Sequence, residues 1–117
     1  MQQITLNIGL NVGRTEPSGI LSNALVAVGN RFTVESVAIV AGAWDGVPER
    51  CLVITARKQP FNTLGDYKAL CHALSQDAIA VSDGATIKVY KRDGTTEQGN
   101  PALFHYDLGA HSTWQRE

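Results

Sequence analysis

The sequence predicts an α+β domain whose elements follow in the order β-α-β-β-α-β. Three observations predict it: an alternating apolar segment near the N-terminus, two β-branched segments around a short loop, and two apolar stripes at helical spacing. The chain has 117 residues, of which 44% are hydrophobic, so it fits one domain with its own core.

The N-terminal part predicts a strand and then a helix. Residues 4–12 alternate between branched apolar side chains and small or polar ones, which is the period of a strand with one buried face. Residues 17–30 carry apolar side chains at helical intervals, with Pro17 near the start and Gly29 and Asn30 as the stop. We therefore expect the first helix to end close to Asn30.

The middle of the chain predicts two antiparallel strands. Residues 32–44 and 50–58 are rich in β-branched side chains, which favour strands. Asp45, Gly46 and Pro48 lie between them in the stretch AWDGVPER, and such residues are typical of a turn. This stretch is therefore predicted to be the loop of a hairpin.

A second helix and further strands follow. Thr63 can cap a helix while Asp66, three residues on, returns a carboxylate to the backbone, as in a capping box. Residues 77–81 and 85–91 then predict two short strands joined at an Asp-Gly turn.

These elements together predict the split βαβ arrangement of ferredoxin-like folds. The expected fold class is an α+β sandwich with an antiparallel sheet, two helices on one face, and an extra C-terminal strand or hairpin. Residues 1–94 are expected to form this domain, and residues 95–117 a polar C-terminal extension that is partly ordered.

Charge and cysteine usage exclude several classes of protein. The net charge of −1 predicts no nucleic-acid partner and no membrane partner, because both need clustered Lys and Arg. No stretch of 18 apolar residues occurs, so we expect a cytoplasmic protein. Cys51 and Cys71 lack the spacing of a zinc or redox motif and are interpreted as reduced core thiols. The sequence predicts no metal, no cofactor and no catalytic residue.

Charged residues are distributed unevenly, and this predicts self-association. Residues 1–44 hold four of them, and the other seventeen follow. The segment 32–44 is apolar on both faces, with Val34, Ala38 and Val40 expected on one face. Because an extended apolar surface marks association, we expect a homo-oligomer, a dimer or higher, and a protein partner is a further expectation. The predicted interface residues are Val34, Val37, Ile39, Val40 and Trp44. In the alternative, the C-terminal segment covers this face.

Polar side chains near the predicted strand ends are candidates for binding a small molecule. The set consists of Asn7, Asn11, Trp44, Glu49, Arg50 and Gln76. For Gln76 an alternative stays open, because its amide at a helix-to-strand junction can satisfy backbone groups instead.

Two short motifs resemble known proteins. Trp44-Asp45-Gly46 with Glu49, and the later run from Gln76 to Val81, are similar to small uncharacterised proteins of phages and other mobile elements. The element order is also similar to PII and CutA-like oligomers, although the loop after residue 44 is short and the phosphate-contacting residues of PII are not recognisable. The resemblance implies no particular activity.

Three functions follow as hypotheses. The first is a non-enzymatic, self-associating interaction protein, for example an accessory protein of a phage or mobile element. The second is a small-molecule or nucleotide binder with its pocket at a subunit interface. The third is a small ferredoxin-like enzyme.

Overall fold

The computed structural model contains two helices and eight strands in the part of the chain that it describes. The described residues are 2–44, 47–59, 63–98, 104–106 and 112–114. The elements are β1 (Gln2–Gly9), α1 (Ile20–Gly29), β2 (Thr33–Trp44), β3 (Val47–Lys58), α2 (Leu64–Ala73), β4 (Ala78–Ser82), β5 (Ile87–Lys91), β6 (Thr96–Gln98), β7 (Phe104–Tyr106) and β8 (Ser112–Trp114).

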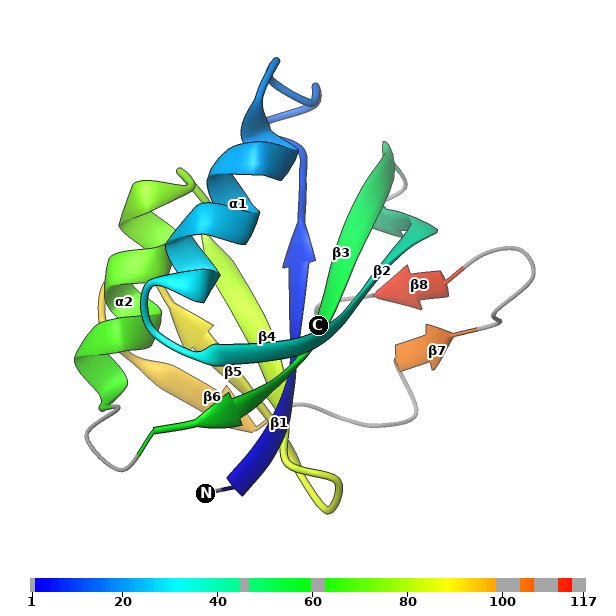
Figure 1. Cartoon of the computed structure of the whole chain (residues 1–117). Coiled ribbons are helices and arrows are strands. Elements are labelled where there is room, and N and C mark those ends of the chain that lie inside the picture. Colours follow the sequence, from blue (N-terminus) through cyan, green and yellow to red (C-terminus); the bar gives the residue numbers. More distant parts are fainter. Residues whose placement is uncertain (1, 45–46, 60–62, 99–103, 107–111, 115–117) are drawn as a thin grey trace.

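Six of these strands form one antiparallel sheet in the order β2-β3-β1-β4-β5-β6. Both helices lie on the same face of this sheet (Figure 1). Strands β7 and β8 pair with each other in a separate small sheet, and β8 lies against β2. The hairpin is on the side of the molecule away from the helices (Figure 1).

The core lies between the helices and the centre of the sheet. Leu6 on β1 is opposite Ile54 on β3 and Val81 on β4, and all three side chains are buried. Since cross-strand partners point to the same face, the alternating apolar residues of β1 face the buried residues of α1 and α2. The predicted strand pattern is therefore confirmed here, although β1 ends at Gly9 rather than at Val12.

The helix ends follow the predicted signals. Helix α1 has Asn30 as its C-cap, as its Gly-Asn stop predicts. Helix α2 has Thr63 as its N-cap, and the Asp66 carboxylate accepts a hydrogen bond from the Thr63 backbone N–H at 2.7 Å. Both predicted boundaries are confirmed.

The predicted fold class is wrong. Instead of a ferredoxin-like sandwich, the chain forms a six-stranded antiparallel sheet with only two helices among the described residues, and strand outweighs helix. The physical reason is that Gly84 and Gly94, both in the left-handed region, reverse the chain twice. Residues 87–98 are thereby returned to the sheet edge beside β4.

Strand β2 differs in detail from the prediction. An irregularity between Val34 and Ser36 shifts the register, so Val34 shares a face with Val37 and Ile39, on the side of the helices. Their exposed fractions are 37%, 44% and 45%, because neither helix covers this edge of the sheet fully. Val40 points to the opposite face and is half-buried, and the side chain of Trp44 lies outside the described residues.

Both cysteines are free and buried, which agrees with their interpretation as core thiols. In the part of the chain that the structure describes, no helix is long and apolar enough to cross a membrane.

Candidate functional site

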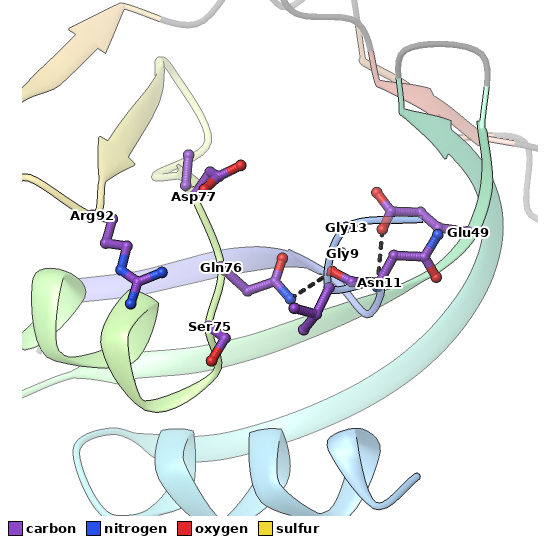
Figure 2. A pocket seen from close by; sticks show the side chains of 10 residues that line it. Gly9, Asn11, Gly13, Glu49, Ser75, Gln76, Asp77 and Arg92 are labelled. Atoms are coloured by element: carbon purple, nitrogen blue, oxygen red, sulfur yellow. Dashed lines mark hydrogen bonds between the residues drawn. The ribbon is translucent and has the colours of Figure 1, made fainter. Parts of the chain in front are cut away.

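A cleft of about 520 Å³ opens at one end of the sheet (Figure 2). Three segments line it: the end of β1 with the turn after it, the start of β3, and the α2-β4 junction with the end of β5. The lining residues are Gly9, Asn11, Val12, Gly13, Glu49, Ser75, Gln76, Asp77, Ala78 and Arg92.

The Glu49 carboxylate lies directly over Gly9. A Cβ atom at position 9 would be 2.6 Å from Glu49 Oε1 and 2.8 Å from Oε2, so this approach requires a residue without a side chain. Glu49 Oε2 accepts a hydrogen bond from the Asn11 backbone N–H at 3.1 Å. The carboxylate is thus held half-buried at the wall of the cleft (Figure 2).

The turn after β1 is fixed from two sides. Gln76 Nε2 donates to the Asn11 carbonyl at 2.9 Å, and Asn11 Nδ2 donates to the Pro48 carbonyl at 3.2 Å. A second, longer bond from Gln76 Nε2 reaches the Leu74 carbonyl at 3.4 Å, so the Gln76 amide satisfies backbone carbonyls, as in the alternative interpretation. This bracing fixes the N–H group that holds Glu49.

The end of α2 directs Gln76 toward that turn. Ser75 has a φ of 52°, the left-handed conformation that commonly follows a helix. The Gln76 N–H then donates to the Cys71 carbonyl at 2.8 Å, and the Ser75 N–H donates to the His72 carbonyl at 3.3 Å. This is the hydrogen-bond pattern of a Schellman motif, so local chain geometry places the buried Gln76.

Asp77 and Arg92 supply charges on the other side of the cleft from Glu49 (Figure 2). The antiparallel register of β4 and β5 pairs Ala78 with Lys91, and the Arg92 N–H donates to the Asp77 carbonyl at 2.9 Å. The cleft therefore presents a carboxylate at one side and a guanidinium with a second carboxylate at the other.

Burial sets the protonation of the groups near this wall. Desolvation raises the pKa of Glu49, and the hydrogen bond from Asn11 offsets part of that rise. Burial, with the nearby charge of Glu49, raises the pKa of the Cys51 thiol to about 12. Cys51 is therefore a thiol at neutral pH, and Glu49 is the carboxyl group at this wall.

The residues predicted to bind a ligand divide into two groups. Asn11, Glu49 and Gln76 lie together in the cleft. Asn7 is farther along the same face of β1, where its Nδ2 donates to the Ala80 carbonyl at 3.4 Å.

Arg50 points to the opposite face from Glu49, because consecutive strand residues alternate. Its guanidinium donates to both carboxylate oxygens of Glu16, at 2.9 and 2.6 Å. This pair lines a neighbouring hollow of about 510 Å³, which Glu49 also lines. The side chain of Trp44 is outside the described residues.

Sequence reasoning missed Gly9, Asp77 and Arg92. A usable signal existed for the last two: the Asp-Gly turn at residues 83 and 84 sets a hairpin register that brings Arg92 beside Asp77. No signal marked Gly9, since its role depends on where Glu49 lies after folding. Within the described ranges, no three His, Cys, Asp or Glu residues are grouped as metal ligands would be.

Comparison with known proteins gives a structural likeness but no family. No family model matches the chain. No curated protein matches it either. A solved structure described as a phage SAM lyase in complex with S-methyl-5'-thioadenosine is similar, with a TM-score of 0.42 and 14% identity over 88% of this chain and 92% of that one. That structure is described as an enzyme, whereas the sequence predicts a non-enzymatic interaction protein for this chain, and that prediction is not carried further.

Proposed function

We propose that the cleft binds a small polar molecule and that Glu49 transfers a proton to or from it. The observation that carries this proposal is the position of the Glu49 carboxylate, which is half-buried over Gly9, held by the Asn11 N–H, and on the wall of the cleft. A carboxyl whose pKa is raised by burial is suited to general acid–base chemistry.

The charges of the cleft favour a zwitterionic ligand. The Glu49 carboxylate attracts an ammonium group, and the Arg92 guanidinium on the other side can pair with a carboxylate. A cavity of about 520 Å³ is in the range of small-molecule sites. We therefore propose free amino acids and their derivatives as the ligand class.

Thermal-shift measurements with matched ligands test this proposal. An amino acid that stabilises the protein should lose most of its effect when its amine is acetylated, and also when its carboxylate is converted to a methyl ester. If acetylation of the amine removes the stabilisation and the methyl ester keeps it, the role of Arg92 is contradicted. The absence of saturable stabilisation by any amino acid or derivative would overturn the proposed ligand class.

Glu49→Gln is expected to abolish ligand stabilisation while leaving the fold more stable than the wild type at neutral pH. The folded-state pKa of Glu49 is raised, so the fold prefers the protonated carboxyl, and ionisation lowers stability. The gain in unfolding free energy of the variant over the wild type should be absent at pH values well below 4.5, the ordinary pKa of a glutamate. It should grow as the pH rises above 4.5. Urea unfolding from about pH 3 to about pH 8 measures this difference.

Glu97→Gln is the matched control, because Glu97 is on β6, pairs with Lys91 at 2.7 Å and does not line the cleft. It should leave ligand stabilisation unchanged. A Glu49→Gln variant that keeps full ligand stabilisation, or that gains no stability with rising pH, would contradict the assigned role of Glu49.

We also propose that the protein self-associates through β2. Val34, Val37 and Ile39 support this, because they form an exposed apolar row on the edge strand, in the part of the chain with few charges. The contact between β2 and β8 of the same chain is the competing arrangement.

Light scattering coupled to size exclusion tests the association. The wild type should elute well above its monomer mass of 12.6 kDa, and the double variant Val37→Lys, Ile39→Lys should elute at that mass. Leu64→Lys changes a more exposed apolar position at the start of α2, and it should not change the oligomer. A monomeric wild type at micromolar concentration would overturn the proposal.

A further inference from the structure

A third, much smaller hollow of about 100 Å³ lies at the opposite end of the sheet from the cleft. It is lined by the start of β1, the end of β3, strands β4 and β5 with the turn between them, and one side of α2. Its polar lining residues are Gln2, Lys58, Tyr67, Asp83, Thr86, Lys88 and Tyr90. We call it the Tyr-Lys hollow.

Tyr67 is the unusual residue of the Tyr-Lys hollow. Its exposed fraction is 3%, and its hydroxyl has no hydrogen-bond partner among the described residues. The ring stacks on Tyr90, with centroids 4.1 Å apart. Burial raises the pKa of both phenols, so each keeps its proton at neutral pH and can donate a hydrogen bond. Among the described residues no fully buried side-chain oxygen or nitrogen lacks a partner, so the Tyr67 hydroxyl, which has none, is accessible at the wall of the hollow, where a ligand or water can accept its proton.

Two lysines add positive charge to the same hollow. Lys58 at the end of β3 is half-buried and Lys88 on β5 is exposed. Neither forms an ion pair with any residue that the structure describes. Ammonium groups in this setting attract anions.

Asp83 adds a negative charge to the lysine charges of the Tyr-Lys hollow, and its carboxylate accepts hydrogen bonds within the turn between β4 and β5. Oδ1 accepts hydrogen bonds from the backbone N–H groups of Ala85 and Thr86 at 3.0 and 2.8 Å, and from the Thr86 hydroxyl at 3.3 Å. With two lysines and one aspartate, the hollow carries a net charge of about +1.

We propose that the Tyr-Lys hollow binds a phosphate group, with the Tyr67 hydroxyl and the ammonium groups of Lys58 and Lys88 donating to its oxygens. A volume of about 100 Å³ suits a tetrahedral oxyanion and not a larger organic ligand. The phosphate group can be free inorganic phosphate or the phosphoryl group of a small metabolite. This site is separate from the cleft of Glu49.

Isothermal titration of the full chain at constant ionic strength tests the proposal, with inorganic phosphate and glycerol 3-phosphate as probes. Saturable binding of either is expected. Tyr67→Phe, which removes only the hydroxyl, and Lys88→Gln should each weaken it about tenfold, the typical effect of losing a hydrogen bond to a charged group. If both probes bind, free phosphate is a sufficient ligand for the hollow. If only glycerol 3-phosphate binds, the ligand is a phosphorylated metabolite.

Two control variants change charged residues outside the Tyr-Lys hollow. Lys68→Gln removes an exposed lysine of α2 outside the hollow, and Glu49→Gln alters the distant cleft; neither should change phosphate binding. The proposal is overturned if neither probe binds saturably by about 10 mM, a concentration well above the range of specific sites. It is also overturned if Lys68→Gln weakens binding as much as Lys88→Gln, or if Tyr67→Phe and Lys88→Gln both bind like the wild type.

Discussion

Replacing Leu6 with alanine is expected to lower the free energy of unfolding by about 2–5 kcal/mol. Leu6 is fully buried at the centre of β1, with Ile54 and Val81 beside it on the neighbouring strands. The substitution removes buried methyl groups and leaves a cavity that a sheet held on both sides of β1 cannot close. Because small domains are stable by only about 5–15 kcal/mol, this single loss is a large share of the total stability.

Urea unfolding measures this effect, and Val26→Ala is the matched control. Val26 is on α1 with an exposed fraction of 62%, so its truncation should change stability by no more than about 0.5 kcal/mol. Similar losses in the two variants would show that β1 is not the centre of the core.

Gly9→Ala is expected to have the largest effect on the cleft. The new Cβ atom would lie 2.6 Å from Glu49 Oε1, a distance that Cβ atoms do not tolerate, so the carboxylate must shift, and we expect it to leave the Asn11 N–H. Because the carboxylate is the end of a flexible side chain, the protein should still fold. Ligand-induced stabilisation should fall sharply, with an apparent Kd raised about tenfold or more by loss of a charged hydrogen bond.

Gly29→Ala separates this effect from the general consequence of replacing a glycine. Nothing lies within 4 Å of a Cβ atom at position 29, the last residue of α1, and its φ is not in the left-handed region. The control should keep ligand stabilisation and gain up to about 1 kcal/mol of stability from the less flexible unfolded chain. Equal ligand stabilisation in Gly9→Ala and the wild type would contradict the placement of Glu49.

Patterns among neighbouring residues predict most helices and strands well. The predictions fail where the structure depends on the pairing of strands that are distant in the sequence. The period-two pattern of β1 and the caps at Asn30 and Thr63 depend on neighbouring residues, so they can be read from the sequence. The six-stranded sheet depends instead on how β5 and β6 extend the edge at β4, which the order of elements does not determine. The irregularity after Val34, which moves that side chain to the face of the helices, carries no sequence signal.

The candidate site can be predicted only in part for a similar reason. Asn11, Glu49 and Gln76 are polar residues at strand ends, and the fold brings them together. No pattern in the sequence marks Gly9, because the group that lies over it is the carboxylate of Glu49, forty residues later in the chain. The position of Arg92 opposite Asp77 follows from the register of β4 and β5, for which the Asp-Gly turn at residues 83 and 84 is the signal in the sequence.

The pKa of Glu49 reports whether its carboxylate is held half-buried over Gly9. Carbon-detected NMR titration of the side-chain carboxyl, in the wild type and in Gly9→Ala, gives this value without any ligand. We expect a pKa above the ordinary value of 4.5 in the wild type, because burial disfavours the ionised form, and a return toward 4.5 in Gly9→Ala. A wild-type pKa at or below 4.5, or one that Gly9→Ala leaves unchanged, would contradict a carboxylate held half-buried over Gly9.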